Sequence, residues 1–228
     1  MAFELNSVVP WGRTFGEYEK MFMLSSEDID KRIISFGDGP ASFNAEMAEM
    51  GKKVTSIDPI YQFTAAQIAK RIEETRAQVI NQTRENERNF VWDAIKSVDD
   101  LEEIRMKAMG SFLLDFKKGY AEKRYISHSL PDKANFADNE FELGLSSHFL
   151  LLYPKLGFDF HLSAIREMMR ICTEVRIFPI LTLDVKLPDF FNELLDVLNQ
   201  DYFTEIRKVP YEFQKGGNEM LVIKKRVD

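Results

Sequence analysis

The segment RIISFGDGPASFNAEMAEMGKKVTSIDP (residues 32–59) limits the fold more than any other part of the chain. Its apolar runs at 32–36 and 54–57 have the length and composition of strands. Between them, residues 41–50 favour a helix that ends at Gly51, a residue suited to the position after a helix. A strand, a helix and a second strand in this order predict a parallel βαβ unit.

Strand and helix candidates alternate over the rest of the chain, apart from one long helical stretch. Residues 62–121 are polar, helix-favouring and free of proline. They predict two or three helices with a break near residues 97–100, where Ser97 or Asp99 caps the next helix. This is too much helix for one crossover, so we expect an insert between strands two and three. Later strands are expected at 124–127, 141–153, 174–180, 202–213 and 220–226, and helices at 159–172 and 188–199. The end of the 141–153 candidate is either strand or the start of a helix.

The last two strand candidates are joined by the short loop QKGGNE. A parallel connection needs a dozen or more residues, so these strands must pair antiparallel. The predicted fold class is therefore α/β: a Rossmann-like open sheet, mostly parallel with an antiparallel last strand, and helices on both faces. We expect a single domain over residues 1–228, in which residues 1–30 form an N-terminal helical lid and residues 62–121 the helical insert.

Composition and charge narrow the classes of partner. The formal net charge of −7 argues against nucleic acid as the main partner. The single cysteine, Cys172, excludes an intrachain disulfide and fits a reducing compartment, where we expect a buried structural thiol. No apolar run approaches the roughly 20 residues of a membrane helix, and the N-terminus lacks the pattern of a signal peptide. We expect a cytoplasmic protein with no membrane partner.

Two glycines and an acid follow the first two predicted strands. Gly37 and Gly39 end the first strand, and Asp58 ends the second strand, 19 residues after Gly39. Ligands of open α/β sheets bind at such carboxyl ends, where glycines allow close approach and a carboxylate binds ribose hydroxyls. Alternatively, the glycines only form a tight turn and Asp58 only caps a helix. A dinucleotide is disfavoured, because Ser42 stands where its fingerprint needs a third glycine.

Together, IISFGDGPAS, Asp58, NFADNEFELGLSSHFLLLY and the closing Gly-Gly hairpin resemble the class I S-adenosylmethionine-dependent methyltransferases. The resemblance covers about residues 30–60 and 120–226. It implies S-adenosylmethionine as the cofactor and an unidentified methyl acceptor, either a small molecule or a protein side chain. By the same resemblance, the cofactor's amino-acid tail lies at Phe36, Gly37, Asp38, Gly39 and Pro40, its ribose at Asp58, its adenine near Pro59, Ile60, Ser129 and Leu130, and its methyl group near Ser146 and Ser147.

One departure from the family pattern concerns the first strand. The family usually has Asp or Glu two residues before the first glycine, where this chain has Ser35. Asp38 is an alternative acid for the cofactor's ammonium group. The departure and the long insert leave a second hypothesis open: a non-catalytic S-adenosylmethionine-binding or assembly module of the same fold. A nucleotide-dependent oxidoreductase is a third, which Ser42 disfavours.

Three histidines are candidates for proton transfer. His148 falls where the family places residues that face the acceptor, and an imidazole there takes a proton near neutral pH. Alternatively, it is only hydrogen-bonded at a strand end. His128 is expected to face solvent, with a place in the adenine loop as the alternative, and His161 is expected to begin a helix. The spacing of the three predicts no metal site. The segment around Arg13, Tyr18 and Met21 either covers the cofactor or packs as an amphipathic helix. We also allow for a homodimer.

Overall fold

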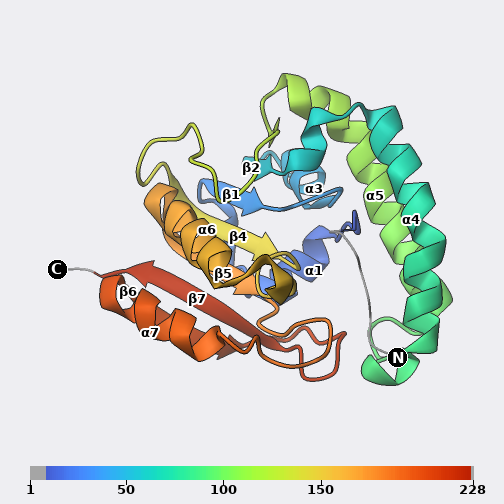
Figure 1. Ribbon diagram of the computed structural model, residues 1–228. Coiled ribbons are helices and arrows are strands. Elements are labelled where there is room, and N and C mark those ends of the chain that lie inside the picture. Colours follow the sequence, from blue (N-terminus) through green and yellow to red (C-terminus); the bar gives the residue numbers. More distant parts are fainter. Residues whose placement is uncertain (1–8, 227–228) are drawn as a thin grey trace.

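The computed structural model describes residues 9–226, and within them a seven-stranded sheet forms the centre of the molecule (Figure 1). The strand order is β3-β2-β1-β4-β5-β7-β6. The strands are β1 (Ile33–Phe36), β2 (Val54–Ile57), β3 (Tyr125–Ile126), β4 (Phe141–Ser147), β5 (Cys172–Phe178), β6 (Tyr202–Lys208) and β7 (Glu219–Lys225).

The pairing of the strands confirms the predicted fold class. The pairs that join β3, β2, β1, β4 and β5 are parallel, whereas β7 lies antiparallel to both β5 and β6. This is the Rossmann-like sheet with an antiparallel last strand that the class I resemblance implies. The chain leaves β1 towards β2 on one side and returns to β4 on its other side. The carboxyl ends of β1 and β4 therefore flank the switch in strand order, where open α/β sheets bind ligands.

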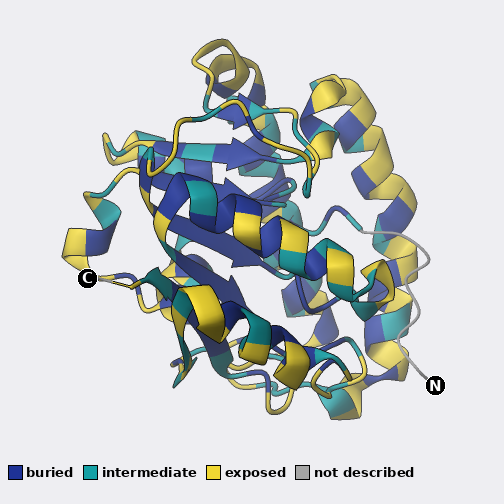
Figure 2. Cartoon of the chain, turned by 60° about the vertical axis from the view of Figure 1, so that its left-hand side comes forward, coloured by how far each residue is buried: buried dark blue, intermediate teal, exposed yellow. Residues whose placement is uncertain are grey.

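Alternating side chains of the strands form a core on each face of the sheet. Ile34 and Phe36 point to the face covered by α6 (Phe158–Ile171) and α7 (Phe191–Asp201). Ile33, one residue before Ile34, points to the opposite face, with α1 (Phe15–Phe22) and α3 (Phe43–Glu49). Figure 2 shows the strands as a buried layer between helices whose outer faces are exposed. The period of two along a strand thus explains how one short apolar run serves two cores.

The N-terminal segment packs on the sheet. A capping box between Thr14 and Glu17 begins α1, and its residues Tyr18, Met21 and Phe22 are buried. The short helix α2 (Ser26–Ile29) follows with a capping box of its own. The amphipathic packing expected for this segment is therefore present in residues 9–30. The rest of the predicted N-terminal lid, residues 1–8, lies outside the described residues.

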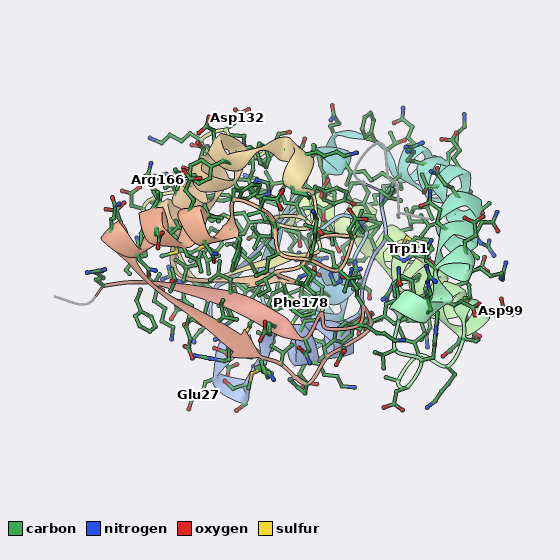
Figure 3. The ribbon with its side chains drawn as sticks, turned by 60° about the horizontal axis from the view of Figure 1, so that its bottom comes forward. Trp11, Glu27, Asp99, Asp132, Arg166 and Phe178 are labelled. Atoms are coloured by element: carbon green, nitrogen blue, oxygen red, sulfur yellow. The ribbon has the colours of Figure 1, made fainter. Side chains whose placement is uncertain are left out.

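The helical insert is present as expected. After the short helix η1 (Pro59–Gln62), the chain forms α4 (Ala65–Glu85), η2 (Glu87–Asn89) and α5 (Val98–Ala121). Ser97 caps α5, as one of the two sequence alternatives predicted. In Figure 1 the two long helices stand side by side at one edge of the molecule. Figure 3 shows Trp11 of the N-terminal segment on the inner side of this pair, where it packs on the cluster of Ile68, Ile72 and Phe112.

Three strands are shorter than predicted, and the candidate at 124–127 forms only β3. The candidate at 141–153 ends as a strand at Ser147, because His148 and Leu151 adopt left-handed backbone angles and turn the chain. The short helix η3 (Pro154–Leu156) follows. The candidate at 202–213 ends as β6 at Lys208, two residues before Pro210, which has no backbone N–H for the ladder. Within residues 9–226, no helix has both the length and the apolar character needed to cross a membrane.

Candidate cofactor and acceptor pocket

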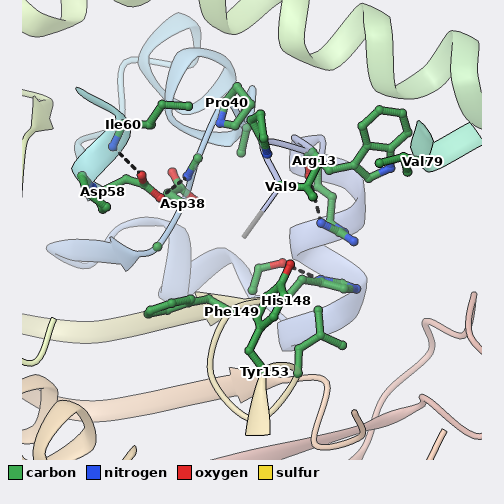
Figure 4. A pocket seen from close by; sticks show the side chains of 18 of the residues that line it. Val9, Arg13, Asp38, Pro40, Asp58, Ile60, Val79, His148, Phe149 and Tyr153 are labelled. Carbon is green, nitrogen blue, oxygen red and sulfur yellow. Dashed lines mark hydrogen bonds between the residues drawn. The ribbon is translucent and has the colours of Figure 1, made fainter. Parts of the chain in front are cut away.

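A cavity of about 550 Å³ opens at the carboxyl ends of β1, β2 and β4, beside the switch in strand order (Figure 4). This volume lies in the range of roughly 300–1,000 Å³ that is usual for small-molecule sites. Its walls come from the turn after β1, the loop after β2, residues 128–130, the end of β4, the N-terminal segment, the insert and the loops near the C-terminal hairpin. The fold thus joins distant parts of the sequence around one space.

The turn after β1 has the geometry that its two glycines predict. Gly37 and Gly39 both have positive φ angles, 62° and 54°. A side chain on Gly37 would meet the ring of Phe149 at 2.6 Å, whereas one on Gly39 would meet nothing within 4 Å. The Tyr61 hydroxyl donates to the Gly39 carbonyl over 2.7 Å and supports the turn from behind. Gly39 therefore leaves open space on the cavity side of the turn.

Asp58 links the loop after β2 to the glycine turn. Its Oδ2 accepts the backbone N–H of Gly39 over 3.0 Å, and its Oδ1 accepts that of Ile60 over 2.8 Å. It therefore caps η1, so the simpler of its two predicted roles is real. Burial raises its pKa to about 6, against the opposing effect of the two N–H groups, with a further increase from the charge of Asp38. Each carboxylate oxygen keeps a lone pair for a further donor.

Asp38 follows the end of β1 and is held there by three hydroxyl groups. Its side chain is buried and accepts the hydroxyls of Ser35 over 2.6 Å, Ser56 over 2.5 Å and Tyr18. Burial raises its pKa, and these three hydroxyl donors act in the opposite direction. Ser35 thus holds a carboxylate that comes from the turn, three residues along the chain. An acid is present at the end of β1, although the sequence position that normally carries it is a serine.

The predicted adenine-side residues also meet in the cavity. Pro59, Ile60, Ser129 and Leu130 all line it. His128 lines the cavity too, and its Nε2 lies 2.9 Å from the Asp132 carbonyl oxygen, so this loop is closed on itself. His128 therefore lines the cavity and is also partly exposed to solvent, because the residue is half-buried.

The end of β4 brings Ser147 and His148 to the cavity. The His148 N–H donates to the Phe178 carbonyl over 2.7 Å, and its Nδ1 lies 2.9 Å from the Ser147 hydroxyl. Burial, Arg13 and Arg105 lower the pKa of His148 well below its usual value. The expectation that His148 titrates near neutral pH is therefore wrong, and its ring is neutral there.

Two predicted site residues do not line the cavity. Phe36 is fully buried in the core beneath α6, with its ring close to Gly144. Ser146 is fully buried in the sheet, and its hydroxyl has no hydrogen-bond partner among the described residues. Both lie one residue before a residue that lines the cavity. Because successive strand residues face opposite sides, their side chains are directed away from it.

More than half of the cavity wall comes from residues that sequence patterns did not single out. They are mostly apolar and come chiefly from the N-terminal segment, the insert, the segment after β4 and the C-terminal region. The N-terminal segment provides Val9, Pro10 and Trp11, the insert provides Gln62, Phe63, Arg71, Val79, Thr83, Asn89, Phe90 and Leu101, the segment from the end of β4 to α6 provides Phe149, Leu152, Tyr153, Leu156 and Phe160, and the C-terminal region provides Leu183, Phe213 and Gln214. No local motif marks them, since they meet only through tertiary packing.

The remaining polar candidates lie elsewhere. Cys172 is fully buried, and burial raises its pKa, so it is a structural thiol as expected. His161 lies in the first turn of α6, where its Nδ1 is 2.6 Å from the Gly157 carbonyl oxygen. Within residues 9–226, no three His, Cys, Asp or Glu side chains are grouped to hold a metal ion.

Comparison with known proteins gives one relative by sequence and several by structure. No family model matches the chain. "Uncharacterized protein MJ0045" of Methanocaldococcus jannaschii is 36% identical over 223 residues, which are 97% of this chain and 98% of that protein. A TehB-like SAM-dependent methyltransferase of Corynebacterium glutamicum has 16% identity over 92% of this chain and 88% of its own, with a TM-score of 0.49. The PH0226 protein of Pyrococcus horikoshii has 11% identity over 93% and 89%, with a TM-score of 0.48.

Proposed function

We propose that this chain, which belongs to the same family as the Methanocaldococcus jannaschii protein, is an S-adenosylmethionine-dependent methyltransferase. The observation that carries the proposal is the meeting of the glycine turn, Asp38 and Asp58 in one cavity at the switch in strand order. This is the constellation that the class I resemblance implies, and the strand order and the antiparallel β7 agree with it.

The residues of the cavity fit the proposed cofactor. Open space in front of Gly39 accommodates the methionine part close to the backbone. The Asp38 carboxylate suits an ammonium group, and the free lone pairs of Asp58 suit the two hydroxyls of a ribose. The half-buried Ile60 and Leu130 provide an apolar surface for a purine ring. No part of this set requires a metal ion.

The chemistry needs little more than orientation. Bound S-adenosylmethionine supplies a methyl group on a sulfonium, and the acceptor's lone pair forms the new bond to carbon as the C–S electron pair passes to sulfur. The glycine turn, Asp58 and the end of β4 hold the two reactants in line, which is the main source of rate in such a displacement. The apolar wall excludes water from the transfer.

His148 is the proposed residue for handling the acceptor's proton. When the Ser147 hydroxyl donates to Met21 Sδ, 3.9 Å away, it accepts from Nδ1–H of His148. Nε2 is then unprotonated and accepts a hydrogen bond from an acceptor O–H or N–H. Since the pKa of His148 is low, it orients the acceptor's lone pair more than it stores a proton.

A binding module without transfer is the alternative. The observation in its favour is the low pKa of His148, which makes a weak base. Ser35 no longer favours it, because Asp38 supplies a carboxylate at the same end of β1. Transfer of a labelled methyl group to any compound of a cell extract would rule this alternative out.

The test is calorimetric titration with S-adenosylmethionine and S-adenosylhomocysteine. We expect both to bind, and Asp58→Ala to weaken binding at least about tenfold, because hydrogen bonds to a charged group contribute about 1.5–3 kcal/mol. The matched control is Asp138→Ala, which removes an exposed carboxylate that pairs with Arg170 outside the cavity and leaves the affinity unchanged. Absence of binding at millimolar concentrations to the folded wild-type chain would sink the proposal.

A further inference from the structure

Within residues 9–226, Arg13 carries a positive charge that has no carboxylate of its own. In the described residues Arg13 and Arg105 lie beside one carboxylate, that of Glu17. Arg105 takes both oxygens of Glu17, at 2.6 and 2.7 Å, and the Tyr211 hydroxyl donates to Glu17 over 2.9 Å. Two guanidinium groups therefore share one carboxylate, and that carboxylate is hydrogen-bonded to Arg105.

The Arg13 side chain also has unused donors. Its one hydrogen bond to a described residue runs from Nη1 to the Trp11 carbonyl oxygen, over 3.0 Å. Its Nε is buried without a partner, and no ion pair among the described residues includes it. Burial and Arg105 lower its pKa to about 10, so the group keeps its charge at neutral pH. A buried, charged donor without an acceptor is costly unless a ligand supplies one.

Arg13 lies in the half of the cavity opposite Asp58 (Figure 4). Burial lowers the pKa of His148, and the charge of Arg13 lowers it further. Burial raises the pKa of Tyr153, and the charge of Arg13 partly opposes that increase. In Figure 4 the Arg13 side chain lies on the side of Val79 and His148, whereas Asp58 and Ile60 lie on the other side. An ammonium group at Asp38 and a ribose at Asp58 leave the Arg13 half of the cavity for the second reactant.

Contacts between the insert and the C-terminal region support the mostly apolar wall of that half. The rings of Phe90 and Phe213 stack with centroids 4.8 Å apart, and the N–H of Val91 donates to the Phe213 carbonyl over 2.7 Å. The side-chain amide of Gln214 donates to the Thr182 carbonyl over 2.9 Å and joins the hairpin loop to the segment after β5. The cavity volume of about 550 Å³ suits a small molecule.

We propose that the methyl acceptor is a small molecule with an apolar body and one anionic group, a carboxylate or phosphate, which Arg13 binds. The apolar body packs on Val79, Leu101 and Phe90, and the nucleophile points to His148. The inference rests on the proposed function, because it assigns Arg13 to the acceptor and not to the cofactor.

The test uses benzoate and phenyl phosphate as probes, and benzyl alcohol as their neutral counterpart. Each is titrated into the full chain saturated with S-adenosylhomocysteine. We expect both anions to bind the wild type. The substitution Arg13→Met should lower their affinity at least about tenfold, and Arg13→Lys should give an intermediate affinity. The affinity of benzyl alcohol should not respond to either variant. Arg76→Met is the control, since Arg76 lies on the insert outside the cavity and pairs with Glu102.

The outcomes separate this inference from the proposed function. Failure of both anions to bind the saturated wild type would overturn the inference, as would equal affinities in the wild type and Arg13→Met. A loss of S-adenosylhomocysteine affinity in Arg13→Met, with no change for the probes, would assign Arg13 to the cofactor's carboxylate and also overturn it. Binding of the anions through Arg13 without any binding of S-adenosylhomocysteine would support the anion site and sink the proposed function instead.

Discussion

At the scale of single residues, the glycines of the turn after β1 have different functions. Gly37 is required by packing, because a β-carbon there would overlap the ring of Phe149. Gly39 has free space before it, so only its positive φ and the proposed ligand require a glycine. Asp38 between them is held by three hydroxyl groups and cannot turn freely. The turn is therefore rigid on its protein side and open on its cavity side.

The substitution Gly39→Ala tests separately whether the backbone conformation and the proposed ligand require a glycine at this position. Left-handed backbone costs an alanine about 1–2 kcal/mol, so we expect a loss of stability of that size in urea unfolding. Gly51→Ala is the matched control, because Gly51 also has a positive φ and open space around it, but ends α3 outside the cavity. We expect similar losses of stability in both, and weaker S-adenosylhomocysteine binding only in Gly39→Ala. Equal affinities in the two variants would contradict a ligand at the turn.

At the scale of elements, a buried ion pair joins the insert to the N-terminal helix. Arg105 of α5 is 1% exposed and binds both oxygens of Glu17 in α1. Tyr211, from the segment between β6 and β7, donates to the same carboxylate. Three elements that are distant in sequence therefore meet at one acid. Their meeting positions Arg13, which lies just before α1 and forms part of the cavity wall.

Arg105→Met should destabilise the protein strongly, since breaking a buried pair costs about 3–5 kcal/mol. Burial raises the pKa of Glu17, but the charge and hydrogen bonds of Arg105 outweigh it and lower the pKa to about 2. A lowered folded-state pKa gives stability that is present above the ordinary value of 4.5 and is lost as the pH falls towards 2. Urea unfolding at pH 7 and pH 3 should therefore show a smaller difference between wild type and variant at pH 3.

The control for this variant is Arg84→Met, which removes an exposed pair with Asp99. Exposed pairs contribute little, so its stability should stay close to that of the wild type at both pH values. A loss in Arg105→Met that is no larger than in Arg84→Met would show that the buried pair does not join the elements.

At the scale of the whole molecule, the central sheet and the helical insert differ in how far neighbouring elements bury them. β4 has a parallel neighbour on each side and is almost fully buried. α4 is the outermost helix, and its buried residues Ile68, Ile72 and Val79 lie on one face only. The cavity lies between the sheet and this outer helix pair, so we expect its insert wall to open at a lower free energy than the core.

We expect this difference in native-state hydrogen exchange. Amides of α4 should open at a lower free energy than those of β4 and β5, with exchange faster by roughly a hundredfold or more. The matched helix is α6, which is covered by both the sheet and α7 and should exchange with the core. Protection of α4 equal to that of α6 would contradict a separately opening insert. The cytoplasmic location and the homodimer expected from the sequence stay predictions.

Local patterns were sufficient for the elements and for the part of the site that lies on them. The apolar runs at 32–36 and 54–57, the Gly-Gly loop and the helix-favouring insert predicted the sheet, its antiparallel last strand and the long helices. Of the predicted cofactor positions, the turn and Asp58 meet in the cavity, because strand ends of a parallel sheet share an edge. Phe36 and Ser146 do not line the cavity. Side chains alternate between the two faces of a strand, and a sequence motif alone does not show which of them face the cavity.

The sequence by itself determined the fold class and the proposed cofactor half of the cavity, since periodicity, glycines and turn lengths act over a few residues. Only the tertiary structure decided the acceptor half. In that half, Arg13, the insert and the C-terminal hairpin meet although more than a hundred residues of chain separate the first from the last. The charges of Arg13, Arg105 and Glu17 interact only because packing brings these residues together. The same packing made Asp38, held by Ser35, the acid at the end of β1. Burial and charge depend on neighbours in space, which no local pattern specifies.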